Sequence, residues 1–378
     1  MSKKVAILGA GLSGLNCALQ LEKISDYSIE IFEQGNKIGG RIQTDTVDGF
    51  LLDRGFQVFL PNYPEALQTF NYDKLTLHPF LPGAEIDGSY VGDPIRNPSS
   101  LLPSLFSSIG TIKDKILILK LRQEKRFPRS GIQTIDYLKE FGFSEHIIDN
   151  FFKPFFSGVF LDKNLNNDAT FFQFLYQLFS HAYASLPQNG MQDLPQNISN
   201  QLIRSKINLS CKVQVIDSNT LKLNTEKVKK FDFIVQSFPS TKTKFRQVTT
   251  DYFWTQKTDK KDEKPALRLY TKNKYINHIA PLSSANKNYS PKGKTLWSVN
   301  SLMKTDEAQI HKELESIYPN HKFHFLKRFF IPQALPEINQ HPKVKNNIYF
   351  CGDFLETPSI NGALVSGRKA AESIMKNR

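Results

Sequence analysis

Residues 4–14, KVAILGAGLSG, decide the fold of this chain. Residues 5–8 are a continuous apolar run ended by glycine, which predicts a short, fully buried strand of a parallel sheet. The run is followed by the spacing GxGxxG and then by residues 15–21, which are apolar at helical spacing. A second strand is predicted over residues 27–32. A strand, a glycine turn, a helix and a strand in this order are typical of a dinucleotide-binding βαβ unit.

Each glycine of the turn has a predicted task. Gly9 permits the tight turn from strand to helix, and Gly11 lets a pyrophosphate approach the backbone. Gly14 lets the helix pack closely on the strand, while the start of the helix offers free N–H groups to phosphate oxygens. Glu33 ends the second strand, where a carboxylate accepts hydrogen bonds from the adenosine ribose. The alternative is that the glycines only form a βα turn.

A second glycine pair, Gly39-Gly40, precedes Arg41. A domain that binds only a nicotinamide cofactor has no need of this pair, whereas a cofactor with a second nucleotide half that runs back over the loop does. Arg41 can donate charge-assisted hydrogen bonds to the pyrophosphate. The alternative is a glycine turn beside a solvated arginine. The next residues open a predicted hairpin that turns at Asp48-Gly49.

The C-terminal end of the chain supplies a second candidate half-site. The apolar residues 348–351 end at Gly352-Asp353, and a helix with small residues in its first turns begins near residue 360. Asp353 can accept hydrogen bonds from sugar or ribityl hydroxyls. The N–H groups near Asn361, Gly362 and Ala363 form a helix start suited to negative charge on a reduced flavin. The alternative is an ordinary strand, loop and helix with a stray aspartate.

Together these motifs resemble the FAD-containing amine oxidase superfamily, which includes monoamine and polyamine oxidases, protoporphyrinogen oxidase and phytoene desaturases. Three interior stretches, residues 187–194, 212–235 and 328–336, are also similar to segments of this family, the last to its desaturase-like branch near the flavin ring. The resemblance implies an α/β fold: a Rossmann-like FAD-binding domain of the glutathione-reductase type with an inserted α+β substrate domain. It also implies that the backbone of Val213 faces the adenine.

The motifs and the resemblance together predict a set of cofactor-binding residues. They are Gly9, Gly11, Leu12, Ser13, Gly14, Glu33, Gln34, Gly39, Gly40, Arg41, Val213, Gly352, Asp353, Asn361, Gly362 and Ala363. No cysteine stands in the setting by which monoamine oxidases attach flavin covalently, so FAD is expected to bind noncovalently. Cys351 is predicted to be a small core residue.

The strands at both ends must share one sheet, so the FAD-binding domain is predicted to be discontinuous. We assign it to residues 1–75, 186–250 and 325–378, and the substrate domain to residues 76–185 and 251–324. The phenylalanine-rich residues 151–160 form either the wall of an apolar substrate channel or plain core packing.

In such a flavoenzyme the cofactor accepts a hydride at N5, and no metal is required. The three cysteines form no CxxC pair and none of the eight histidines has ligand spacing, so no metal site is expected. Amine oxidases often place a lysine near N5, and here Arg268 is the nearest cationic candidate. Phe56 is a second candidate beside the flavin ring, with a core role as its alternative. The missing lysine weakens the prediction of amine oxidation.

The charge of the chain is strongly basic, with a formal net charge of +13 and a pI near 9.4. This balance favours acidic ligands or an anionic membrane surface, but no nucleic-acid partner is expected. No apolar stretch reaches the ~20 residues that cross a bilayer. We expect a cytoplasmic protein. The lysine-bearing helix around residues 113–125 either touches a membrane peripherally or is a solvated face. The oligomeric state is not predicted.

We therefore predict an FAD-dependent oxidoreductase that removes two electrons from a largely apolar small molecule. A desaturase-like dehydrogenation is favoured, with amine oxidation as the alternative and oxygen or a quinone as electron acceptor. A further alternative is a non-enzymatic escort-type protein, which shares the GxGxxG unit without binding flavin. A nicotinamide-only dehydrogenase would need no C-terminal half-site.

Overall fold

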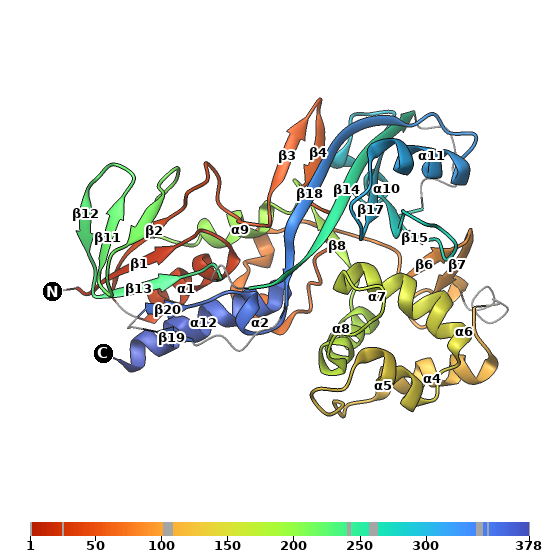
Figure 1. Cartoon of the computed structure of the whole chain (residues 1–378), viewed down its shortest axis with the longest axis horizontal. Helices are drawn as coiled ribbons and strands as arrows, with labels where there is room; N and C mark the ends of the chain where they lie inside the picture. Colours follow the sequence, from red (N-terminus) through yellow and green to blue (C-terminus); the bar gives the residue numbers. More distant parts are fainter. Residues whose placement is uncertain are drawn as a thin grey trace.

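The computed structural model describes residues 2–24, 26–100, 109–239, 243–256, 264–337, 343–345 and 348–377. Figure 1 shows two lobes. The first lobe contains both termini and is built on a six-stranded sheet with the order β19-β20-β13-β1-β2-β9. Its strands are β1 (Lys4–Leu8), β2 (Ser28–Phe32), β9 (Lys206–Asn208), β13 (Phe233–Gln236), β19 (Val344–Lys345) and β20 (Ile348–Phe350).

The sheet joins the two ends of the chain as predicted. Strand β1 pairs in parallel with β2 on one side and with β13 on the other, and β13 pairs in parallel with β20. The helices α1 (Leu12–Ile24) and α12 (Ile360–Lys376) lie against each other. They approach so closely that a Cβ built on Gly367 would lie 2.3 Å from the carbonyl oxygen of Ser13. The first and last motifs of the sequence therefore meet in one lobe.

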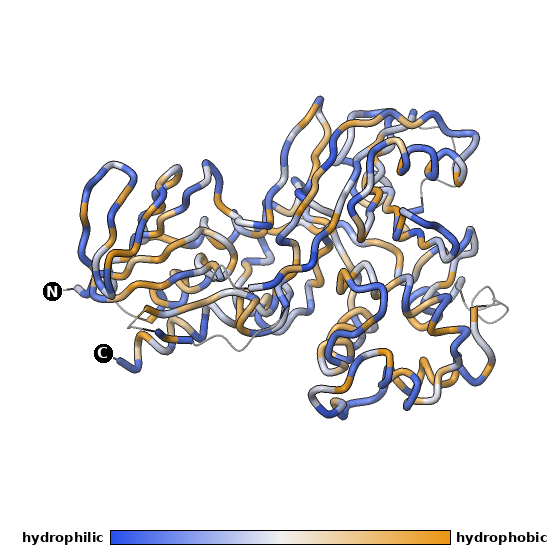
Figure 2. Tube along the Cα trace, viewed as in Figure 1, coloured by the Kyte–Doolittle hydropathy of each residue, from blue (hydrophilic) through white to orange (hydrophobic). Residues whose placement is uncertain are grey.

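Smaller elements lie in the first lobe and between the two lobes, where the buried Phe50 and Leu52 pack with side chains of the second lobe. The predicted hairpin is present as β3 (Thr44–Val47) and β4 (Phe50–Asp53), and its turn at Asp48-Gly49 has φ values of 50° and 81°, as the favoured two-residue hairpin turn requires. The other strands and α-helices are α2 (Pro64–Thr69), β5 (Leu77–Pro79), β8 (Ser185–Pro187), α9 (Asp193–Ser199), β10 (Val213–Val215), β11 (Thr220–Leu223) and β12 (Val228–Lys230). In Figure 2 the strands inside the first lobe are mostly hydrophobic, whereas the outer loop of the β11–β12 hairpin is hydrophilic.

The second lobe contains a seven-stranded sheet with the order β18-β14-β17-β16-β15-β6-β7. Two long strands, β14 and β18, run from the first lobe into this sheet (Figure 1). The predicted domain boundaries at residues 250 and 325 therefore fall inside one strand and at the start of the other. The strands are β6 (Gly83–Ile86), β7 (Ser89–Gly92), β14 (Phe245–Gln256), β15 (Leu267–Leu269), β16 (His278–Pro281), β17 (Lys294–Ser301) and β18 (His324–Pro336).

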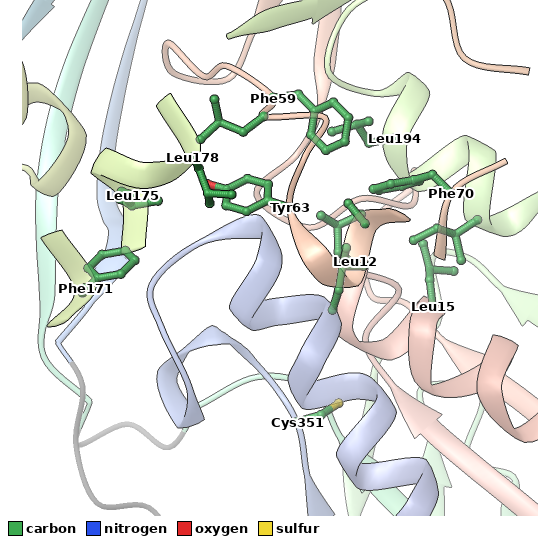
Figure 3. Close-up of a cluster of buried hydrophobic side chains, with 14 of the residues drawn as sticks. Leu12, Leu15, Phe59, Tyr63, Phe70, Phe171, Leu175, Leu178, Leu194 and Cys351 are labelled. Carbon is green, nitrogen blue, oxygen red and sulfur yellow. The ribbon is translucent and has the colours of Figure 1, made fainter. Parts of the chain in front are cut away.

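Helices form the other half of the second lobe. They are α4 (Ile112–Gln123), α5 (Thr134–Phe141), α6 (Glu145–Ile147), a π-helix over Ile148–Phe152, α7 (Lys153–Phe160) and α8 (Ala169–His181), with α10 (Leu282–Ala285) and α11 (Glu307–Ile317) beside the sheet. Phe152, Phe156, Phe160 and Phe172 are almost completely buried and contact one another. These rings belong to a core that continues into the first lobe, and Figure 3 shows part of it, from Leu12 through Phe59 and Tyr63 to Phe171. Cys351 is fully buried in it, which confirms its predicted core role.

A buried carboxylate ties the hairpin to both lobes. Asp53 accepts hydrogen bonds from the Thr44 hydroxyl (2.6 Å), the backbone N–H of Met191 (2.9 Å) and the Tyr289 hydroxyl (2.7 Å). Its carbonyl oxygen accepts a fourth from the Tyr252 hydroxyl (2.8 Å). Burial raises the pKa of Asp53 to about 6, although its hydrogen-bond donors act in the opposite direction.

Candidate active site

A cavity of about 1070 Å³ is lined by residues of both lobes. This volume is slightly above the usual range for ligand pockets, about 300–1000 Å³. Thirteen of the sixteen residues predicted to bind a cofactor line it: Gly9, Gly11, Leu12, Ser13, Glu33, Gln34, Gly39, Gly40, Arg41, Val213, Gly352, Asp353 and Ala363. The three others, Gly14, Asn361 and Gly362, lie behind this surface.

The glycines at the start of α1 have the geometry that a pyrophosphate needs. Gly9 has a φ of +100°, which few residues other than glycine adopt. A Cβ on Gly14 would lie 2.2 Å from the carbonyl oxygen of Gly9, so this glycine serves packing. A Cβ on Gly11 would meet nothing within 4 Å, because it would point into open space at the cavity. The backbone is therefore open to a ligand at Gly11.

The carboxylate of Glu33 is held beneath the glycine turn. Its two oxygens accept hydrogen bonds from the backbone N–H groups of Ala10 (2.9 Å) and Gly35 (2.7 Å). A carboxylate has further acceptor positions, so a ribose hydroxyl can still donate to it. The position of Glu33 fits the predicted role at the adenosine end.

Arg41 connects the motifs from the two ends of the chain. Its guanidinium donates to the carboxylate of Asp353 (2.5 Å) and to the carbonyl oxygen of Ala334 (2.9 Å). Ala334 belongs to β18, in the stretch predicted to lie near the flavin ring, and residues 329–335 line the cavity. Arg41, Asp353, Glu33 and the glycine turn of residues 9–14 together form a binding surface that we call the cradle. Its cation and N–H groups suit phosphates and its carboxylates suit sugar hydroxyls, so these residues fit FAD.

The N-terminus of α12 is less open than the sequence predicts. Ser359 caps the helix, because its hydroxyl accepts from the N–H of Gly362 (3.0 Å) and its carbonyl oxygen accepts from the N–H of Ala363 (3.0 Å). The side-chain oxygen of Asn361 accepts from the backbone N–H of Glu65 (3.1 Å). In this structure the three residues mainly hold the helix in place, and Ala363 alone of the three lines the cavity.

Aromatic and aliphatic side chains line the part of the cavity in the second lobe. They are Phe56, Phe80, Phe151, Phe155, Phe156, Val159, Phe171, Leu175, Phe179 and Leu267. Phe56, a predicted catalytic residue, lies with its ring 5.1 Å from the ring of His278 and 6.4 Å from that of Phe80, measured between centroids. Residues 151–160 therefore serve both as core and as cavity wall, and Phe156 belongs to both.

Arg268 does not lie in the cavity, contrary to the prediction that it approaches the flavin. Its neighbour Leu267 lines the cavity, and successive side chains of a strand point to opposite faces of the sheet. The guanidinium of Arg268 therefore packs on the other face, 4.9 Å from the ring of Trp297, and donates to the Tyr318 hydroxyl (2.7 Å). Its cation–π contacts are structural, and we assign it no role in the reaction.

His278 lines the cavity and was missed by the sequence analysis. The Ser157 hydroxyl donates to the side-chain oxygen of Asn277 (2.8 Å), so the amide nitrogen of Asn277 faces His278 Nδ1 (3.1 Å) and donates to it. This chain places the imidazole hydrogen on Nε2, which has no hydrogen-bond partner within the described ranges. Burial lowers the pKa of His278 to about 3, so it is neutral at physiological pH. An isolated histidine in a strand offers no motif by which it could have been found.

Within the described ranges, no group of three or more histidine, cysteine or acidic side chains could hold a metal ion. None of the helices in the same ranges is both long and apolar enough to cross a bilayer.

Comparison with known proteins places this site in a family. A family profile described as flavin containing amine oxidoreductase matches residues 12–270. Mitochondrial protoporphyrinogen oxidase of Nicotiana tabacum is 28% identical over 168 residues, 42% of this chain and 32% of the relative. Coproporphyrinogen III oxidase of Bacillus subtilis is 27% identical over 233 residues, 54% of this chain and 46% of the relative. The matched part therefore spans less than half the length of these curated relatives.

Solved structures agree with the fold over the whole chain. An oxidoreductase of Methanosarcina mazei has a TM-score of 0.75 at 16% identity and covers 99% of this chain and 100% of its own. A putrescine oxidase has a TM-score of 0.70 at 14% identity and covers 100% of this chain and 99% of its own. The profile match extends over more than half of the chain and the residues of the cradle fit its cofactor. This chain thus belongs to the flavin-containing amine oxidoreductase family.

Proposed function

We propose that this enzyme removes two electrons from a largely apolar small molecule in a desaturase-like dehydrogenation. The observation that carries the proposal is the continuous cavity, which joins the dinucleotide cradle to a chamber lined by phenylalanines. FAD, when bound, supplies a hydride acceptor at its N5 atom. The task of this chain is to bind and orient the substrate and to exclude water, and the apolar rings serve all three purposes.

Noncovalent attachment of FAD is part of the proposal. Cys17 and Cys351 are fully buried in the core. Cys211 lines the cavity, but it stands two positions before Val213, which we propose for the adenine. It therefore lies at the adenine end of the cofactor and not beside the flavin ring. Glu33 would hold the ribose, Arg41 the pyrophosphate and Asp353 the ribityl chain.

Amine oxidation is the second candidate, because the family profile and the putrescine oxidase structure favour it. The charges of the chamber argue against a cationic substrate. Among the described lining residues the acidic side chains are Glu33, Asp93 and Asp353, of which two belong to the cradle and the third, Asp93, is paired with arginines. The escort-type alternative is disfavoured because the backbone at Gly11 is open to a cofactor.

Anaerobic reduction of the flavin tests the function directly. The purified holoenzyme is mixed with phytoene in detergent micelles, with coproporphyrinogen III and with putrescine, and the oxidised-flavin absorption band is followed. We expect bleaching by the polyene, while free FAD with the same compounds is the control. Bleaching by putrescine alone would establish amine oxidation, and bleaching by the porphyrinogen alone would replace the polyene as substrate class. Reoxidation of the bleached enzyme by oxygen or by a quinone then identifies the acceptor.

We also propose that α4 contacts an anionic membrane. Ile112, Ile116 and Leu119 are 73%, 51% and 47% exposed and follow one another at helical spacing. Lys113 and Lys120 are exposed on the same helix, as expected for binding to anionic lipid. Because Leu119 also lines the cavity, an apolar substrate could pass from the lipid surface into the chamber.

Cosedimentation with vesicles checks this contact. We expect binding to vesicles that contain phosphatidylserine, weaker binding to pure phosphatidylcholine, and a loss of most binding in Ile116→Glu. The matched control is Ile203→Glu, since Ile203 is 90% exposed but lies in the first lobe. Equal sedimentation of the two variants would argue that α4 is a solvated face.

A further inference from the structure

Three charged side chains line the cavity where the β7 loop meets α4. Asp93 follows β7, Arg96 stands three positions later, and Arg122 belongs to the last turn of α4. A single oxygen of Asp93, Oδ2, accepts from Arg96 Nε (2.8 Å) and from Arg122 Nη1 (2.5 Å). All three side chains are mostly buried, with 15–16% of their surface exposed. We call these three residues the arginine cluster.

The arginine cluster carries an excess positive charge. One carboxylate faces two guanidinium groups, so the net charge is +1. The other oxygen of Asp93 accepts from the backbone N–H of Ile95 (2.9 Å). Arg96 also donates to the carbonyl oxygen of Ala182 and packs over the ring of Tyr183. Among the described residues, Arg122 donates a hydrogen bond to Asp93 through Nη1. Its Nε and Nη2 atoms can therefore donate to another acceptor.

A purely structural connection between the β7 loop and α4 would not need two arginines on one carboxylate. One arginine is enough to pair with Asp93 and to connect the β7 loop to α4. A second guanidinium in a mostly buried position costs free energy unless a further anion compensates its charge. The cluster is therefore organised for an anion that enters from the cavity.

We propose that the arginine cluster binds a carboxylate of the substrate. The planar fork of a guanidinium matches the two oxygens of a carboxylate, and a net charge of +1 balances one monoanion. Val91, Ile109, Phe151 and Phe155 line the same cavity as the cluster and pack against the buried Ala84, Ile86 and Leu269, so the rest of the substrate meets apolar walls. This inference rests on the proposed function and narrows it: the substrate is an apolar molecule with an acidic end.

Equilibrium binding to the oxidised holoenzyme tests the proposal without turnover. The probes are cis-parinaric acid, an apolar polyene with one carboxylate, and its methyl ester, and binding is measured by their fluorescence. We expect the acid to bind about tenfold or more tightly than the ester, the effect of a hydrogen bond to a charged group. Equal affinity of the two probes, or failure of the acid to bind, would overturn the proposal, whether or not the variants below fold.

Substitutions in α4 locate the effect. Arg122→Gln is expected to weaken binding of the acid about tenfold or more and to change binding of the ester less than about twofold. Arg122→Lys retains the charge but not the fork, and should give an intermediate loss. Lys139→Gln is the matched control, because it removes the same charge from the last turn of α5, another helix of the second lobe, at an exposed position outside the cavity lining. An equal loss in Lys139→Gln would mean that the general positive field of the lobe, and not the cluster, selects the acid.

The binding of the two probes and the anaerobic reduction of the flavin can fail independently of each other. If no polyene bleaches the flavin but the acid is still preferred over the ester, the dehydrogenation is wrong and the carboxylate site stands. If a neutral polyene bleaches the flavin and the two probes bind equally, the dehydrogenation stands and the carboxylate site is wrong.

Discussion

Gly11→Val is expected to yield a folded protein that no longer retains FAD. The side chain at this position would project into the open part of the cradle, where no protein atom lies within 4 Å of a Cβ. The fold therefore tolerates a valine side chain at this position. The same side chain would occupy the space that the pyrophosphate needs. We expect the flavin content after purification to fall close to zero, a loss of affinity on the order of a hundredfold or more. Absorption spectra and the protein-to-flavin ratio measure it.

Gly14→Ala is the informative comparison, because it affects the other side of the same turn. A Cβ there would lie 2.2 Å from the carbonyl oxygen of Gly9. This variant should lose both stability and flavin, whereas Gly11→Val should keep a cooperative unfolding transition without FAD. Full flavin occupancy in Gly11→Val would refute the position of the pyrophosphate and with it the orientation of the cofactor in the cradle.

The second large effect concerns Asp53 and pH. Its pKa is about 6 in the folded protein, against 3.8 ordinarily, so between these values the folded state binds more protons than the unfolded state. The contribution of this group to stability is thus fully present below pH 3.8 and is lost as the pH rises through 6. A shift of this size corresponds to a loss on the order of 3 kcal/mol.

Asp53→Asn removes this titration and preserves the shape of the side chain. An amide oxygen can still accept from Thr44 and from the N–H of Met191. We expect urea denaturation at a fixed FAD concentration to show that the variant gains stability relative to the wild type between pH 4 and pH 7. Asp48→Asn is the matched control, because it removes a carboxylate from the exposed turn of the same hairpin and leaves the buried hydrogen bonds of Asp53 in place. Parallel pH profiles for the wild type and Asp53→Asn would contradict a raised pKa.

Local motifs explain why so much of the cradle could be predicted. The glycines of residues 9–14 and the turn at Asp48-Gly49 depend on backbone conformations that neighbouring residues impose, so their spacing is visible in the sequence. Arg41 and Asp353 were also recognised one by one from their motifs. Their contact with each other joins positions 312 residues apart, and it follows from the parallel pairing of β1 and β20 with β13 between them.

The division into domains depends on strand pairing, which the sequence does not display. An alternating or apolar run predicts a strand but not the sheet to which it belongs, because pairing partners are chosen by packing. The predicted boundary at residue 250 falls inside β14 and the one at residue 325 lies at the start of β18, and these two strands pair with each other along most of their length. The orientation of Arg268 was missed for a related reason, since the register of a strand decides which of two neighbours faces the cavity.

The amino-acid sequence alone determined the βαβ unit, its cofactor and the presence of strands from both ends of the chain in one sheet. These features depend on short-range spacing and on the apolar content of strands. The tertiary structure alone decided which side chains from distant segments are buried and paired with one another. The neutral state of His278, the raised pKa of Asp53 and the sharing of one Asp93 oxygen by two arginines all depend on burial and on side chains that come from distant segments. Such properties arise from desolvation and proximity, which are created only when the lobes have packed together.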